Sequence, residues 1–118
     1  MNPNSTEELG IKEAMKYECK KGRIAQRVHK CGYDLISKGR GGERHIEVKA
    51  TAKNRFTFRW LEPLEYKKLQ KDKRFYLYLV TNVRTKPKMK RYNRTQLMSK
   101  SHKKVCHYVF VFSDDFPV

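Results

Sequence analysis

Long hydrophobic runs are missing from this chain of 118 residues. No stretch approaches the ~18 consecutive apolar residues that a membrane-spanning helix requires. The polar start, Met1-Asn2-Pro3-Asn4-Ser5, also lacks the basic and apolar regions of a secretory signal peptide. We therefore expect no membrane partner, and a location in the cytoplasm or on the nucleoid.

Cysteine is scarce, and its spacing fits no known framework. The three cysteines, Cys19, Cys31 and Cys106, are an odd number and form no C-x-x-C motif. This pattern argues against a disulfide framework and against a standard zinc site. The neighbouring histidines, His29 and His107, do not supply the usual zinc-ligand spacing either. We expect the cysteines to be reduced packing residues.

Acidic residues are a minority, with 12 Asp and Glu against 28 Lys and Arg and a net charge of +16. Such an excess on a small domain most often neutralises nucleic-acid phosphates, and an acidic membrane surface is the lesser alternative. Hydrophobic residues still make up 38% of the chain, which favours a packed core over disorder. The composition predicts one domain over residues 1–118 that binds nucleic acid.

Acids are absent altogether from residues 84–104, which carry nine Lys or Arg. The segment lacks sustained periodicity, so it is predicted to be a long basic loop. Its aromatic residue could stack on a base while the cations neutralise phosphates. The predicted nucleic-acid contacts are Arg84, Lys86, Lys88, Lys90, Arg91, Tyr92, Arg94, Lys100, Lys103 and Lys104.

Hydrophobic periodicity elsewhere predicts alternating helices and strands. Ser5 with Glu8 fits a capping box, and Gly22 is suited to the position after a helix. The predicted elements are a helix at 6–21, strands at 23–29, 33–37, 45–50 and 56–60, a helix at 63–73, and strands at 75–80 and 105–112. This order predicts an α/β fold with a central mixed β-sheet flanked by helices.

Three polar side chains, Asp34, Glu47 and Lys49, lie in segments that otherwise read as buried strands. Twelve residues, including a glycine-rich turn, separate Asp34 from Glu47, and Lys49 follows two residues later. Because strand side chains alternate, Glu47 and Lys49 share one face. Periodicity also places Glu18 on the core-facing side of the first helix.

These side chains suit divalent-metal chemistry. Mg²⁺ or Mn²⁺ needs only one or two carboxylates together with a phosphate oxygen, so Asp34 and Glu47 are the expected ligands. The Val48 carbonyl is a further expected ligand, and Glu18 an outer one. Lys49 would orient or help to deprotonate a water and stabilise charge on the phosphate. A bound metal would lower the pKa of that water.

The motif and the order of elements together resemble the PD-(D/E)xK nucleases, whose restriction-endonuclease-like core (αβββαβ) matches residues 6–83. A closer resemblance is to the NO VEIN C-terminal domain family, which is similar to a branch of that superfamily. The matching segments are Tyr17-Glu18, Gly22-Arg23, Gly32-Tyr33-Asp34-Leu35, Ile46-Glu47-Val48-Lys49, Glu65 and Tyr76-Leu77-Tyr78-Leu79-Val80. The resemblance implies a nuclease fold and a catalytic role for the acids and the lysine. Tyr33 stands where superfamily members often carry proline, and residues 84–104 lie beyond the resemblance.

Structural explanations of the same residues remain open. Asp34 could satisfy backbone N–H groups, and Glu47 with Lys49 could form an ion pair on a solvated sheet face. A histidine at the start of a strand, such as His45, is more often structural than catalytic. The lysines of the second helix could be a solvated face or could follow a phosphate backbone; they are Lys67, Lys68, Lys71 and Lys73.

The leading functional hypothesis is a metal-dependent endonuclease that acts on DNA, including branched or structured DNA. The alternative is a non-catalytic nucleic-acid-binding module of the same fold in a defence or restriction system. A small RNA-associated protein of ribosomal type is a third interpretation, supported by charge alone. Analogy with stand-alone domains of this size suggests a homodimer.

Overall fold

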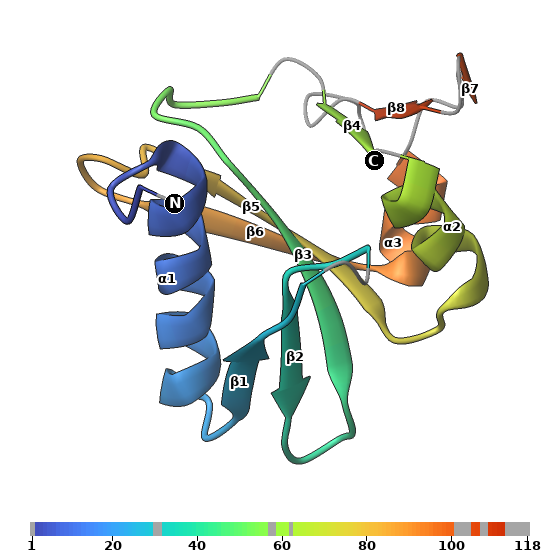
Figure 1. Ribbon diagram of the computed structural model, residues 1–118, viewed down its shortest axis with the longest axis horizontal. Helices are drawn as coiled ribbons and strands as arrows, with labels where there is room; N and C mark the ends of the chain where they lie inside the picture. The colour runs from blue at the N-terminus through green and yellow to red at the C-terminus, as the bar shows by residue number, and fades with distance from the viewer. Residues whose placement is uncertain are drawn as a thin grey trace.

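The computed structural model describes residues 2–29, 32–56, 59–61, 63–100, 105–106 and 109–112. A main sheet lies between helix α1 on one side and helices α2 and α3 on the other (Figure 1). The elements in chain order are α1 (Thr6–Lys20), β1 (Ile24–Arg27), β2 (Leu35–Lys38), β3 (Arg44–Ala50), β4 (Arg59–Leu61), α2 (Pro63–Lys71), β5 (Phe75–Thr81), β6 (Lys88–Asn93), α3 (Arg94–Lys100), β7 (Val105–Cys106) and β8 (Val109–Phe112).

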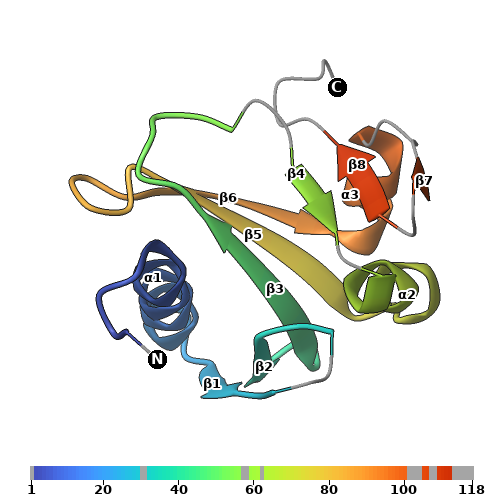
Figure 2. The same cartoon turned by 45° about the horizontal axis from the view of Figure 1, so that its top comes forward.

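The main sheet has five strands in the order β1-β2-β3-β5-β6. Strands β3 and β5 pair in parallel, and the other neighbours pair antiparallel. The connection from β3 to β5 carries α2, as a parallel pair requires a crossover. Strands β4, β8 and β7 form a second, smaller sheet (Figure 2). The predicted α/β class with a mixed sheet flanked by helices is confirmed.

Helix α1 begins and ends close to its predicted bounds. The Ser5 hydroxyl accepts a hydrogen bond from the Glu8 N–H at 3.2 Å, which satisfies one of the free donors of the first turn. Beyond the last turn, Gly22 has a φ of 74°, a left-handed conformation that glycine adopts without strain. No helix within the described ranges is long and apolar enough to cross a membrane.

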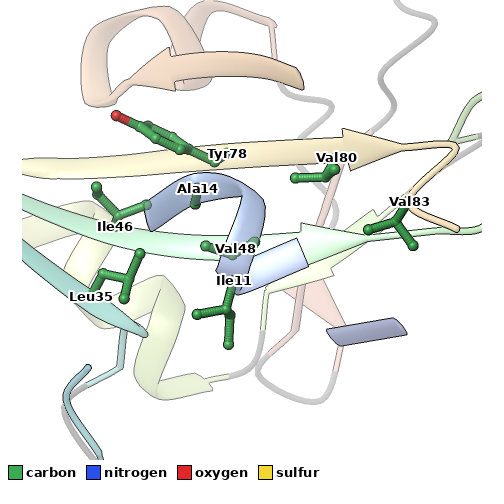
Figure 3. Close-up of a cluster of buried hydrophobic side chains, with 8 residues drawn as sticks. All are labelled: Ile11, Ala14, Leu35, Ile46, Val48, Tyr78, Val80 and Val83. Atoms are coloured by element: carbon green, nitrogen blue, oxygen red, sulfur yellow. The ribbon is translucent and has the colours of Figure 1, made fainter. Parts of the chain in front are cut away.

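Helix α1 packs on one face of the sheet through alternate strand residues. Ile11 and Ala14 lie over Ile46 and Val48 of β3 and Tyr78 of β5, all of them buried (Figure 3). The other face carries a second buried cluster beneath α2 and α3. Its members are Phe56, Leu69, Phe75, Leu77, Leu79 and Leu97. Strands β3 and β5 are therefore covered on both sides, which fixes the direction of every side chain they carry.

Residues 84–100 do not form the predicted basic loop. They contain strand β6, which pairs antiparallel with β5, and helix α3. Strand β6 forms because Met89 packs toward the α1 cluster and Tyr92 toward the opposite one. Helix α3 starts with reciprocal capping: Gln96 N–H donates to Asn93 Oδ1 at 2.8 Å, and Asn93 N–H donates to Gln96 Oε1 at 2.9 Å. The predicted contacts Lys103 and Lys104 lie outside the described residues.

Two predicted strands also have different bounds. The strand expected at 56–60 is observed as β4 at Arg59–Leu61, whereas Phe56 is buried in the core ahead of it. The single strand expected at 105–112 is instead the pair β7 and β8, which run antiparallel to each other. Residues 57, 58, 107 and 108 lie outside the described part of the chain.

The close approach of α1 to β3 gives a stability prediction for Gly10. A Cβ atom at this position would lie 2.5 Å from the Cβ of Ala50, which cannot rotate away. Overpacking of this kind costs ~1–3 kcal/mol, more than the ~1 kcal/mol that alanine gains over glycine as a helix former. We expect Gly10→Ala to lower the free energy of unfolding, measured by denaturant titration. Adding Ala50→Gly should recover part of the loss, and a Gly10→Ala protein as stable as the wild type would contradict this packing.

Candidate active site

Asp34, Glu47 and Lys49 come together at the point where strand β2 begins beside β3. Pairing of the two strands starts at Leu35 with Ile46, so the Val48 N–H lies beyond the reach of the β2 backbone. The Asp34 carboxylate takes the place of the missing strand partner and accepts a hydrogen bond from the Val48 N–H at 2.8 Å. The N–H and C=O of one strand residue point to the same side, so the Val48 carbonyl is directed toward Asp34 as well.

Glu47 and Lys49 share the face of β3 that is directed toward α2. The Lys49 Nζ lies 3.3 Å from Glu47 Oε2 and 3.1 Å from Glu65 Oε1 of helix α2. The Glu47 side chain is 6% exposed and that of Lys49 22%. One ammonium group thus lies between two largely buried carboxyl groups.

Two acids of this cluster, Glu47 and Asp34, have raised pKa values. Burial raises the pKa of Glu47 far above its usual range, and the charges on Asp34 and Glu65 and a hydrogen bond with Glu65 raise it further. Burial also raises the pKa of Asp34, although the hydrogen bond from Val48 opposes this. For Lys49, burial acts to lower the pKa, but Glu47 and Glu65 outweigh it, so the pKa is raised. The cluster holds more carboxyl groups than one lysine could neutralise if all of them were ionised.

The donor set fits a hard divalent cation that keeps some of its water. Asp34, Glu47 and the Val48 carbonyl offer oxygen ligands from two adjoining segments, which are the ligands Mg²⁺ and Mn²⁺ take. Within the described ranges, no three His, Cys, Asp or Glu side chains are grouped so that they could hold a metal ion alone. Water and a phosphate oxygen would have to complete the coordination, as is common for Mg²⁺.

Glu18 does not belong to this cluster, contrary to the sequence prediction. It lies on α1, which covers the opposite face of the sheet, and it is fully buried. The Tyr78 hydroxyl donates to Glu18 Oε2 at 2.7 Å. Two guanidinium groups complete its environment, with Arg23 Nε at 3.2 Å and Arg44 Nη1 at 3.2 Å. Its charge is balanced within the core, so Glu18 is a structural residue here.

Glu65 is the site residue that the sequence analysis missed. It was noted only in the family resemblance, because the apolar periodicity of its helix draws attention to the leucines instead. Pro63 opens α2, and Glu65 in the first turn is carried against Lys49 of β3. Glu7, at the start of α1, also contributes negative charge that raises the pKa of Asp34.

Three of the predicted nucleic-acid contacts, all arginines, contact other parts of the protein. Arg94 donates to the Leu69 and Gln70 carbonyls at 2.7 Å each, which caps α2. The Arg84 guanidinium donates to the Asn4 carbonyl at 2.8 Å, and that of Arg91 lies 4.0 Å from the centre of the Tyr17 ring. These three arginines serve the fold.

Two of the predicted lysines lie on the face of the sheet that carries the carboxyl cluster. Lys88 and Lys90 are exposed on β6, on the same side as the packed ring of Tyr92. Lys90 of β6 pairs in register with Leu79 of β5, and Leu79 pairs with Lys49 of β3. Two strand spacings of ~4.8 Å therefore separate Lys90 from Lys49. Lys86 is exposed in the preceding turn, and the side chain of Lys100 lies outside the described part.

The fold and the cluster define a small mixed α/β domain with buried acids and a lysine on one sheet face. The sequence model of the family described as "Protein NO VEIN, C-terminal" matches residues 6–92. The chain belongs to this family. No curated protein and no solved structure matches it. The matched region includes Asp34, Glu47, Lys49 and Glu65.

The raised pKa of Glu47 predicts that Glu47→Gln increases the free energy of unfolding in a pH-dependent manner. An acid with a raised pKa in the folded state keeps its proton after the unfolded chain has lost it, so stability falls as pH rises above ~4.3. Glutamine resembles the protonated acid without titrating. We expect the variant to exceed the wild type by at least ~1.4 kcal/mol at about pH 8, the equivalent of one pKa unit, and to match it near pH 4.

Urea titrations in the absence of divalent metal provide the measurement. Glu13→Gln is the matched control, because Glu13 pairs with the exposed Lys16 on α1. A stability difference between Glu47→Gln and the wild type that is the same at both pH values would contradict the raised pKa.

Proposed function

We propose that this protein is a metal-dependent endonuclease that hydrolyses phosphodiester bonds of DNA. The observation that carries the proposal is the convergence of Asp34, Glu47 and Lys49 at a largely buried position beside the start of β2. Its membership of the NO VEIN C-terminal family is compatible with a nuclease-like or defence-related domain. The strong positive charge of the chain suits a polyanionic substrate.

The carboxyl groups would hold the metal, and the lysine would act on the attacking water. Asp34, Glu47 and the Val48 carbonyl supply the oxygen ligands. Bound Mg²⁺ or Mn²⁺ would polarise the phosphate and lower the pKa of a coordinated water. Lys49 Nζ, beside Glu47, is placed to orient that water and to stabilise negative charge that develops on the phosphate.

Electrostatics supports a role for a cation at this position. Several carboxyl groups buried around one lysine are unfavourable when ionised, because each ionised carboxylate disfavours the next. The strongly raised pKa of Glu47 expresses that repulsion together with its burial. A divalent cation would favour the ionised forms of Asp34 and Glu47 and remove the repulsion. Perturbed carboxyl groups of this kind are typical of functional sites.

A second function is favoured by the role of Asp34 in the fold. Its carboxylate already satisfies the Val48 N–H, which gives the residue a structural purpose without any metal. A non-catalytic nucleic-acid-binding module in a defence or restriction system would keep this contact. Such a module would bind DNA in a salt-sensitive manner and leave it intact.

Cleavage assays separate the two functions. Purified protein is incubated with linear, single-stranded and branched DNA in the presence of Mg²⁺, Mn²⁺ or EDTA. We expect metal-dependent cleavage, reduced at least ~10²-fold by Glu47→Ala or Lys49→Ala because each removes charge that acts on the transition state. The matched controls Glu13→Ala and Lys16→Ala alter an ion pair on α1, on the opposite face of the sheet, and should retain activity. Cleavage that survives both site variants, or its absence from the folded wild type, would exclude the nuclease.

Glu65 should act as a positioning residue through Lys49. Glu65→Gln keeps the size of the side chain but removes the charge that lies 3.1 Å from Lys49 Nζ. We expect a reduction in cleavage rate of about 10- to 100-fold, the usual effect of altering a partner of a site residue. The pH profile of cleavage should shift to lower pH as the lysine loses a stabilising carboxylate. A rate and a pH profile equal to those of the wild type would show that Glu65 only packs α2 against the sheet.

A further inference from the structure

A basic groove of about 600 Å³ lies between the second half of α2 and the turn that leads into β5. Five of its seven lining residues are lysine or arginine. The residues that form it are His45, Lys67, Lys68, Lys71, Asp72, Lys73 and Arg74. Four of its side chains, Lys67, Lys71, Lys73 and Arg74, are exposed. From sequence alone, the lysines of α2 have two interpretations: a solvated helix face or a contact with phosphate.

The groove adjoins the carboxyl cluster on the same face of the sheet. His45 lies in the groove wall and precedes Glu47 by two residues on β3, so the two side chains share a face at a separation of ~7 Å. Lys68 lies one helical turn after Glu65, with its Nζ 5.8 Å from the centre of the Tyr33 ring. Tyr33 stacks on His45 and directly precedes Asp34, so this end of the groove lies beside the cluster.

The acidic groups near the groove are occupied by contacts within the protein. Asp72 contacts His45 Nδ1 and also accepts a hydrogen bond from the Arg74 N–H at 2.9 Å. Glu43 lies 2.6 Å from His45 Nε2, on the other side of the ring. These contacts join α2 and the following turn to β3 and give the groove a fixed shape.

The end of a helix normally disfavours an anion, because its last carbonyls carry partial negative charge. In α2 this effect is countered by Arg94, which donates to the Leu69 and Gln70 carbonyls. The groove thus presents cations at a helix terminus whose own carbonyls are already paired.

The positive charge of α1 is in the wrong place to serve the cluster. Lys12, Lys16 and Lys20 are exposed on α1, which covers the opposite face of the sheet (Figure 2). A phosphate chain that reaches Glu47 must approach from the α2 side. Location, rather than the amount of charge, therefore distinguishes the groove.

We propose that this groove binds the sugar-phosphate backbone of nucleic acid next to the bond at the carboxyl cluster. Each strand of a duplex rises ~3.4 Å along the axis per phosphate and also winds around that axis, so the phosphate one nucleotide away lies at about the distance that separates Glu47 from His45. Lysine contacts to phosphate carry no sequence information, so the binding is independent of base sequence. The inference rests on the proposed function in taking nucleic acid as the ligand, but it does not require cleavage.

Binding is measured by fluorescence anisotropy in EDTA with short labelled oligonucleotides of mixed sequence, single-stranded and duplex, over about 50 to 200 mM salt. The groove variant combines Lys67→Gln, Lys71→Gln and Arg74→Gln. Lys68 is left unchanged because it contacts Tyr33 beside the cluster. The control combines Lys12→Gln, Lys16→Gln and Lys20→Gln, which remove the same charge from a helix on the opposite face.

We expect the groove variant to bind both forms at least ~10-fold more weakly, with a salt dependence about one unit shallower for each side chain that contacts a phosphate. The control should retain most of the affinity. Equal losses of affinity in the two variants would show that only net charge matters. A larger loss of affinity in the control would place the nucleic acid on the α1 side. Either result overturns the proposal, and so does unchanged binding by the groove variant. Circular dichroism melts confirm that both variants fold.

The groove proposal and the nuclease proposal are rejected by different results. If the wild type does not cleave DNA but the groove variant binds it more weakly, the groove is the interface of a non-catalytic module. If the wild type cleaves DNA in Mg²⁺ and the groove variant binds DNA as well as the wild type does, the nuclease proposal stands and the groove proposal is excluded.

Discussion

The burial of strand β3 on both faces governs the rest of the structure. Its alternating side chains send Ile46 and Val48 into the α1 cluster, and they send Glu47 and Lys49 toward α2. A polar side chain on such a strand has little access to bulk water, so it must find partners from neighbouring elements. Those partners determine which acid is structural and which belongs to a candidate site.

The two faces treat their buried acids differently. On the α1 side, Glu18 is surrounded by the Tyr78 hydroxyl and by the guanidinium groups of Arg23 and Arg44. Its charge is balanced, and removing one partner would leave an uncompensated buried group. On the α2 side, Glu47 meets one lysine that it shares with Glu65. The first arrangement is complete within the protein, whereas the second has an excess of carboxylate that a cation could neutralise.

The sequence predicted features that depend on local pattern. The ends of α1 followed from its capping residues, and the central strands followed from apolar runs and alternation. Alternation also placed Glu47 and Lys49 on one face. Helical periodicity placed Glu18 inside, correctly, but it could not tell which face of the sheet the helix would cover.

Other features depend on contacts between distant segments, and local pattern missed them. Strand β6 has three lysines or arginines among six residues and forms because β5 offers it an edge. The capping pair of Asn93 and Gln96 was a local signal for α3 that the surrounding charge obscured. Glu65 joined the site only through the crossover that brings α2 over β3, which no periodicity could reveal.

Arginine and lysine have different duties in this fold, and the difference bears on how it would meet a polyanion. The buried Arg23 donates to Ser37 Oγ at 2.9 Å and to the Arg40 carbonyl at 2.7 Å. Arg27 holds Glu8 through two hydrogen bonds, at 2.8 and 3.1 Å. The planar guanidinium suits such fixed contacts, whereas the lysine ammonium is a flexible point charge.

Several lysines consequently remain at the surface, among them the three exposed lysines that line the groove. Flexible ammonium groups follow a phosphate backbone without fixing its register or reading its bases. Several arginine forks that could grip a base edge in a bidentate manner, among them those of Arg23, Arg27 and Arg94, are committed to the protein's own carbonyl and carboxylate groups. The division of duties between the two residue types thus favours contact with the backbone of a nucleic acid over recognition of its sequence.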